Sequence, residues 1–115
     1  TNTPLQALVT LNDPVYMEAA QALARRVADG GEINQQIQTM FAFALVRQPK
    51  ATELERLKGL YELMKSELQN DLENARQVAE KPLGPLPESQ DVLHMSALTL
   101  VANAIMNLDE FLMPL

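Results

Sequence analysis

The chain has 115 residues, 47% of them hydrophobic and 21% charged, with a net charge of −6. Its size predicts one globular domain, and the lack of cysteine excludes disulfides, thiolate metal sites, cysteine nucleophiles and covalent c-type haem attachment. The nine basic residues are scattered along the sequence, which disfavours nucleic acid and anionic membrane surfaces as partners. The core must be aliphatic, because the chain holds three Phe, two Tyr and no Trp.

Residues 1–31 predict two helices. Thr3 as N-cap and Pro4 at the first helical position favour a short helix at the start of the chain. A second helix begins at Pro14, after an Asn-Asp cap, and stops at a pair of glycines. Its apolar face repeats every three or four residues: Tyr16, Ala20, Leu23 and Val27.

Two further helices are expected in the middle of the chain. The first runs from about Glu32 to Arg47, and its apolar stripe is wide enough to contact more than one neighbour: Ile33, Ile37, Met40, Phe41, Phe43, Ala44 and Leu45. The second starts at a capping box of Thr52 and Glu55 and continues to about Glu80, a length of roughly 40 Å. Its apolar positions are Leu54, Leu57, Tyr61, Met64, Leu68, Leu72, Ala75 and Ala79.

Residues 81–90, KPLGPLPESQ, cannot continue a helix, because they hold three prolines and a glycine. We interpret them as a connector inside a single helical domain that spans residues 1–115. The predicted fold is all-α, an antiparallel bundle of four main helices plus the short N-terminal helix. Since the chain starts without Met or a signal-peptide pattern, we expect it to be an excised piece of a longer protein.

The last helix is predicted from Asp91 to Leu112, and the other helices need it as their apolar partner. From Val92 to Leu108 its only ionisable side chain is His94. A narrow stripe of neutral polar side chains interrupts this surface: Ser96, Thr99, Asn103 and Asn107. Either the stripe is partly exposed or bonded to a neighbouring loop, for which the TNTP stretch with Asn2 is the natural candidate, or it meets another domain or a ligand.

Asp109 and Glu110 stand near the end of this predicted helix, where acidic side chains oppose the helix dipole. Three explanations stay open at this point. The two carboxylates pair with Arg25, Arg26 or Arg47, or they contact another domain, or they serve as metal ligands or catalytic groups.

No complete active site is expected within the chain. His94 lies more than four helical turns from Asp109, so the two side chains cannot share a metal ion on one helix. Asp109 and Glu110 are adjacent and diverge on the helix, which makes them a poor acid–base pair. The sequence also holds no glycine-rich phosphate loop and no nucleophile elbow. We therefore predict a chain that is not an enzyme and binds no cofactor, and whose last helix is too polar to insert into a membrane.

Three stretches resemble one known family. They are the opening TNTPLQALVTLNDP with EAAQALARRV, the central FALVRQPKATELERL, and the closing NLDEFL. Together they resemble the C-terminal part of the planctomycete domain of unknown function 1553, over essentially the whole chain. That domain occurs in large exported bacterial proteins, often beside planctomycete cytochrome c-like domains. The resemblance implies a periplasmic or cell-surface location and offers no catalytic residues to carry over, because the function of the family is not established. The haem-binding Cys-x-x-Cys-His of the companion domains is absent from this sequence.

Two functions follow as hypotheses. The first is a non-catalytic structural or interaction module whose partners are other domains of the same parent protein or, in a homo-oligomer, further copies of the chain. The second is a segment that completes a hydrolytic or redox active site for a polysaccharide-type substrate, with the catalytic groups upstream. A third hypothesis, a peptide-binding bundle, has the same apolar surfaces. The candidate interaction surface comprises Asn2, Ser96, Thr99, Asn103, Asn107, Asp109 and Glu110.

Overall fold

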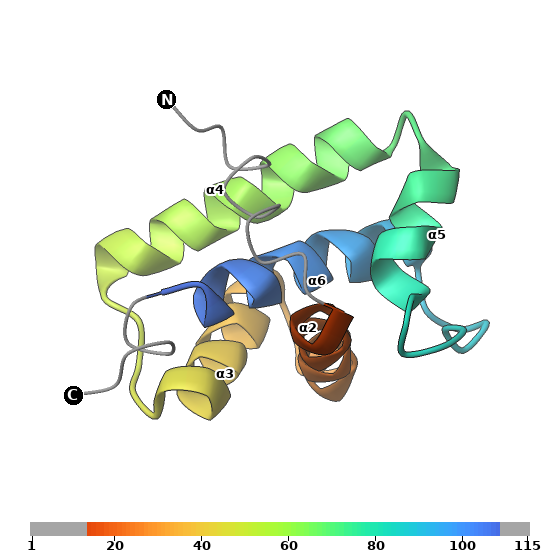
Figure 1. Ribbon diagram of the computed structural model, residues 1–115. Helices are drawn as coiled ribbons and strands as arrows, with labels where there is room; N and C mark the ends of the chain where they lie inside the picture. The colour runs from red at the N-terminus through yellow and green to blue at the C-terminus, as the bar shows by residue number, and fades with distance from the viewer. Residues whose placement is uncertain (1–13, 109–115) are drawn as a thin grey trace.

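A computed structural model describes residues 14–108, and five α-helices make up most of this part (Figure 1). They are α2 (Pro14–Val27), α3 (Ile33–Leu45), α4 (Ala51–Leu68), α5 (Leu72–Glu80) and α6 (Val92–Met106). Residues 14–108 contain no strand, so the all-α prediction is confirmed. The short helix expected at Thr3 and Pro4 lies outside the described residues.

Helix α6 is the centre of the bundle, as the sequence predicted. It contacts each of the other four helices, and in Figure 1 it runs between α4 on one side and α2 and α3 on the other. Every residue from Met95 to Asn103 is buried, and Leu98, Val101 and Ile105 are fully inaccessible to water. A helix surrounded on all sides must be apolar around its whole circumference, and the sequence of α6 meets that demand apart from the polar stripe.

Helix α6 is shorter than predicted, because it ends at Met106 and not at Leu112. Asn107 is its C-cap, and its backbone N–H donates to the carbonyls of Asn103 and Ala104 in a tightened last turn. Asparagine favours such ends because its short amide competes with helical hydrogen bonding. The expected extension of α6 is therefore wrong at residues 107 and 108, and Asp109 and Glu110 fall outside the described residues.

The long helix predicted up to Glu80 is also wrong, since a turn at residues 69–71 divides it into α4 and α5. The Asp71 carboxylate accepts a hydrogen bond from the Asn74 N–H at 3.2 Å and caps α5. This arrangement lets α5 fold back across the end of the bundle (Figure 1). Leu72, predicted to be in the core, is 59% exposed, whereas Tyr61, Met64, Leu68, Ala75 and Ala79 are buried as expected.

The start of α4 differs from the predicted capping box. The N-cap is Lys50, and its backbone N–H donates to the Glu53 carboxylate at 2.8 Å, while Thr52 and Glu55 lie inside the first turns. Glu53 takes this position because Arg47 also holds it, through two hydrogen bonds of 3.0 Å each. A bidentate arginine–carboxylate pair fixes geometry more firmly than a hydroxyl cap.

Candidate functional site

The polar stripe of α6 lies inside the protein. Ser96 is fully buried and Thr99 is 1% exposed, and each hydroxyl donates to a carbonyl of its own helix, Leu93 at 2.9 Å and Met95 at 2.7 Å. Such bonds to the preceding turn satisfy a buried hydroxyl without any second element.

Asn103 is the exception within the stripe. Its side chain is fully buried, and its Nδ2 lies 3.4 Å from the sulfur of Met17 on α2, which is a weak acceptor. Its Oδ1 atom has no hydrogen-bond partner among residues 14–108. Asn107 is partly buried at the end of α6. Asn2, Asp109 and Glu110 fall outside the described residues, so the structure does not place them beside the stripe.

Gln21 of α2 fastens the 81–90 connector to the bundle, a role that the sequence analysis missed. It is fully buried. Its Nε2 donates to the carbonyls of Val78 at 2.8 Å and Lys81 at 2.5 Å, and its Oε1 accepts the Leu83 N–H at 3.0 Å. The only sequence signal was a glutamine on the apolar side of an amphipathic helix, next to Ala20.

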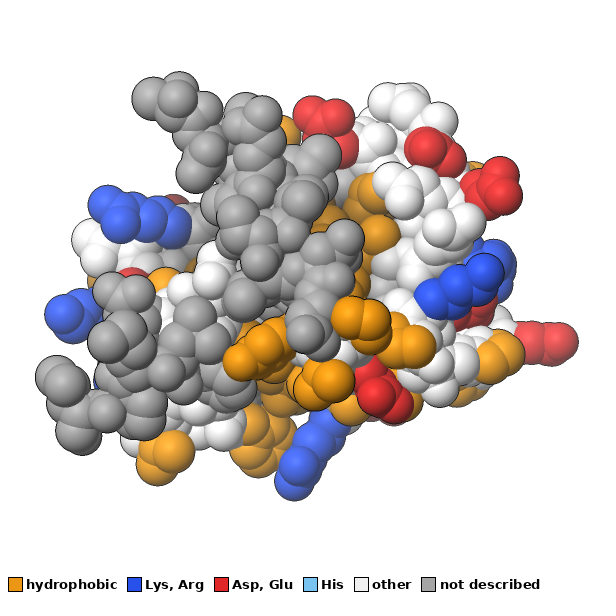
Figure 2. All heavy atoms as spheres, in the orientation of Figure 1, with side chains coloured by type: hydrophobic (Ala, Val, Ile, Leu, Met, Phe, Trp, Pro, Cys, Tyr) orange, Lys and Arg blue, Asp and Glu red, His pale blue; other side chains and the backbone are white. Residues whose placement is uncertain are grey.

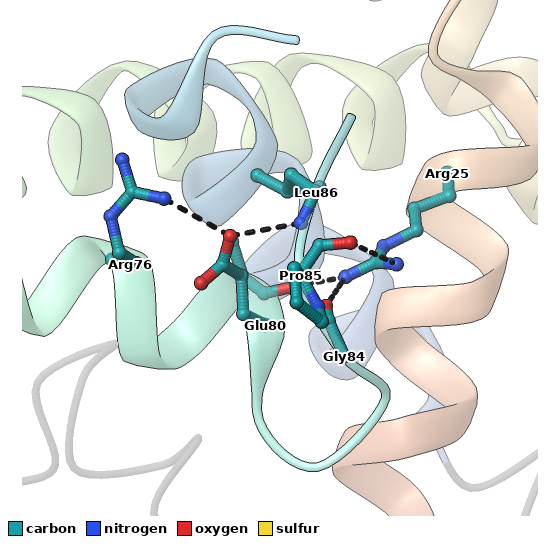
Figure 3. A network of polar contacts seen from close by, with 7 residues as sticks. Arg25, Arg76, Glu80, Gly84, Pro85 and Leu86 are labelled. Carbon is teal, nitrogen blue, oxygen red and sulfur yellow. Dashed lines mark hydrogen bonds and ion pairs between the residues drawn. The ribbon is translucent and has the colours of Figure 1, made fainter. Parts of the chain in front are cut away.

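Arg25 and Glu80 hold the same connector from two sides (Figure 3). The Arg25 guanidinium points from α2 towards the connector and donates to the carbonyls of Ala79, Gly84 and Pro85. Glu80 accepts the Leu86 N–H at 2.8 Å and pairs with Arg76 at 3.1 Å. Both side chains form hydrogen bonds with backbone groups of the connector, which indicates a structural role.

A tyrosine and a histidine form the closest pair of titratable side chains described outside the ion pairs. The Tyr61 hydroxyl lies 2.6 Å from Nδ1 of His94, and the two rings meet edge to face. Burial lowers the pKa of His94, with Lys65 acting in the same direction and Asp91 opposing it. Burial also raises the pKa of Tyr61. Both shifts favour the neutral forms, so the pair joins α4 to α6 through an uncharged hydrogen bond.

The end of α3 and the turn that follows it form one of several places in the described chain where apolar side chains remain in water. Val46 is 88% exposed and adopts the left-handed conformation, with φ 58°, while its N–H closes the helix on the Ala42 carbonyl. Phe43, one turn earlier, is 48% exposed, although its stripe was predicted to contact more than one neighbouring helix. The guanidinium of Arg26 stacks over the Phe43 ring at 4.2 Å from its centroid.

Residues 14–108 were searched for groups of metal ligands and for recesses between the helices. No group of three His, Asp or Glu side chains converges there to hold a metal ion. A partly enclosed recess of about 210 Å³ lies between α4, α5 and α6 and is lined by Met64, Glu67, Leu68, Asp71, Asn74, Val78 and Leu100.

The surface carries mixed charge. On the face in Figure 2, described Lys and Arg side chains lie at the left, right and lower edges, while described Asp and Glu side chains gather mainly at the upper right and right edges. Within residues 14–108, no helix combines the length and apolar character needed to cross a membrane.

Comparison with known proteins gives one result. No curated protein and no solved structure matches the chain. The model of the family PSD1, described as "Protein of unknown function (DUF1553)", matches residues 1–61. This match includes two of the stretches on which the resemblance rests and covers more than half of the sequence, although it stops within α4. The chain therefore belongs to the DUF1553 family of proteins of unknown function.

Proposed function

We propose that the chain is a non-catalytic helical module that supports and contacts other parts of a large exported bacterial protein. The observation that carries this proposal is the exposed turn after α3. There, Val46 holds a backbone conformation that β-branched residues rarely adopt, and its side chain is 88% exposed. Exposed apolar groups held at the expense of stability are typical of surfaces that contact another protein segment.

The conformation of Val46 is set by the turn and not by its side chain. A helix that ends with a left-handed residue prefers glycine there, because a Cβ atom crowds the backbone. The next residue is Arg47, whose guanidinium carbon lies 4.7 Å from the centroid of the Phe41 ring and which also binds Glu53. These neighbouring contacts fix the geometry of the turn. A valine at this position therefore destabilises the turn, and its exposed methyl groups do not recover that loss.

The size of this surface favours a partner within the same polypeptide. Two partly exposed side chains, Phe43 and Val46, supply only a small part of the roughly 800 Å² that each partner buries in a stable interface between separate proteins. A covalently linked segment needs less area, because its effective concentration is high. We therefore name another part of the parent protein as the partner, in preference to a second copy of the chain.

The polar groups of the described part agree with a supporting role. Gln21, Arg25 and Glu80 bind the backbone of the connector, and Ser96 and Thr99 bind their own helix. Side chains engaged in this way are not available to activate a substrate or a water molecule. A periplasmic or cell-surface location is part of the proposal and rests on the family resemblance alone.

Hydrogen–deuterium exchange tests the proposal. The backbone amides of residues 43–48 are measured in the 115-residue chain and in the natural polypeptide that contains it. We expect slower exchange at this turn in the longer protein, and we expect F43A with V46G to abolish the difference. L72A is the matched control, since Leu72 is also an exposed apolar side chain but lies on α5. Equal exchange at residues 43–48 in both proteins would contradict the proposal.

A further inference from the structure

Helix α4 presents a second row of side chains beside the row that is buried in the core. The members of this row, the outer seam, recur at spacings of four, three and four residues: Arg56, Leu60, Leu63 and Glu67. Residues at these spacings share one face of a helix. Leu60 is partly buried, Leu63 is 40% exposed, and both line a shallow hollow on the surface of α4. The outer seam therefore places two leucines side by side on α4, which lies along one edge of the bundle in Figure 1.

Gly59 adjoins the outer seam, and the described helices do not account for a glycine there. It is exposed in the interior of α4, and a Cβ atom at this position would meet no described atom within 4 Å. Glycine in a helix interior lowers stability relative to alanine, because it loses more backbone freedom on folding. A single copy of the fold thus gains nothing from this glycine, whereas a second chain packed closely against α4 would need the space.

The two ends of the outer seam carry opposite charges. Arg56 and Glu67 are both exposed, and neither forms an ion pair among residues 14–108. From the N-terminal to the C-terminal end, the order is cation, leucine, leucine, anion. An antiparallel copy of the same helix places anion against cation and leucine against leucine, whereas a parallel copy brings like charges together. The order is its own complement, which favours a second copy of the chain over other occupants.

We propose that two copies of the chain associate through antiparallel α4 helices, with a two-fold axis that crosses the outer seam between Leu60 and Leu63. A two-fold contact forms each residue pair twice. Leu60 then faces Leu63 of the second copy, and Arg56 faces Glu67 of the second copy. Gly59 lets Leu63 of the second copy approach the backbone of α4. This contact is separate from the exposed turn after α3, for which the proposed partner is another part of the parent protein.

The length of the outer seam determines how strong this association is. From Arg56 to Glu67 it covers about 16 Å of helix, so the contact is smaller than the roughly 800 Å² that each partner buries in a standard interface. We therefore expect a weak, reversible dimer with a dissociation constant between about 10 µM and 1 mM. Measurements at about 0.15 M salt screen the repulsion between two copies that each carry a net charge of −6.

Sedimentation velocity of the 115-residue chain, at concentrations from about 10 µM to 1 mM, tests the arrangement through a charge exchange. R56E and E67R should each weaken association about tenfold, because each places like charges opposite one another twice. The R56E copy has an anion at both ends of its outer seam, and the E67R copy has a cation at both ends. An equimolar mixture of the two variants should therefore re-form dimers. Failure of the mixture to associate would overturn the antiparallel pairing.

Two further variants separate the outer seam from exposed apolar surface in general. L63D should abolish association, whereas L72D should leave it unchanged, since Leu72 is 59% exposed but lies on α5. G59A should raise the Tm of the monomer and yet weaken association, an outcome that a purely structural glycine would not give. Circular dichroism checks that each variant is folded. An unaltered chain that stays monomeric up to about 1 mM, or equal losses in L63D and L72D, would overturn the proposal.

Discussion

Two of the connections between helices are stabilised in different ways. The connector 81–90 is held by the buried Gln21 and by Arg25 and Glu80, and all three side chains form hydrogen bonds with its backbone. The α3–α4 turn is held by contacts that include the ion pair between Arg47 and Glu53, and it leaves Val46 exposed. The backbone of the first connection is bound by a buried side chain, whereas the second connection leaves an apolar side chain in water.

This difference separates two kinds of polar residue. A buried amide that satisfies three backbone groups is hard to replace, because its loss leaves each of those groups without a partner. A bidentate ion pair near the surface fixes a conformation but contributes modestly to the free energy of unfolding. Substitutions in the two turns should therefore differ in magnitude and, for Val46, in sign.

The largest expected effect is at Gln21. Q21L keeps the volume but leaves the carbonyls of Val78 and Lys81 and the N–H of Leu83 unpaired, so we expect a loss of about 3 kcal/mol in the free energy of unfolding. Chemical denaturation measures it. Q77L, an exposed position on α5, serves as control and should change stability by less than about 0.5 kcal/mol. A similar loss in both variants would remove the distinction between the two turns.

A smaller effect is expected at Glu53, with a defined pH dependence. The Arg47 guanidinium and the Lys50 N–H hold the pKa of Glu53 at about 2, below its ordinary value of 4.5. The charged form is thus favoured in the folded state, so this stabilisation is complete above pH 4.5 and is lost as the pH falls towards 2. E53Q should lower the free energy of unfolding by about 1 kcal/mol at neutral pH. The loss should become smaller as the pH falls from 4.5 towards 2.

Denaturation of both proteins across this pH range checks the prediction. E55Q is the control, since Glu55 is exposed on the same helix and shows no ion pair among the described residues. A pH-independent difference between E53Q and the unaltered chain would mean that the ion pair does not hold the turn.

The substitution V46G should raise the free energy of unfolding, whereas Q21L and E53Q should lower it. Glycine adopts the left-handed conformation without crowding, so we expect a gain of about 0.5–1 kcal/mol despite the greater freedom of the unfolded chain. Thermal unfolding would show it as a raised Tm. V15G, at an exposed position in the first turn of α2, should lower the Tm because glycine weakens a helix. A destabilised V46G would mean that the valine side chain supports the turn.

The smallest effect concerns the Tyr61–His94 pair, which lies away from both turns. Burial lowers the pKa of His94 below its ordinary value of 6.5, so the folded state favours the neutral imidazole. The contribution of neutral His94 to the free energy of unfolding is therefore complete above pH 6.5 and is lost as the pH falls below that value. K65M should raise the pKa of His94 by removing a repelling charge, and D91N should lower it while keeping a capable N-cap. An NMR titration of the imidazole protons measures both, and a shift of the same sign would contradict this account.

The sequence predicted the helical class, the central α6 and most of the core, because these follow from apolar residues at helical spacing. It failed where one or two polar residues override that spacing. The stripe through Tyr61, Leu68 and Ala75 continues without interruption across Asp71, so periodicity alone could not reveal the break between α4 and α5. Asn70 and Asp71 were the available signal, since such pairs favour turns and helix caps.

The candidate site was predictable only in part. The polar stripe of α6 could be read from its spacing, but its burial depends on how four other helices pack around it. Gln21 could not be identified, because its three partners lie more than 50 residues away in the sequence. Contacts of that kind are determined by the tertiary fold and leave no local pattern.

The hydrogen bond between Tyr61 and His94 has a consequence for the limits of this domain. The family match ends at Tyr61, halfway along α4, while its hydroxyl binds a residue on the last helix. A polypeptide shortened to the matched region would lack α5 and α6, and the inner faces of α2 and α3 would be open to water. Among residues 14–108, the unit that folds therefore extends beyond the stretch by which the family is recognised.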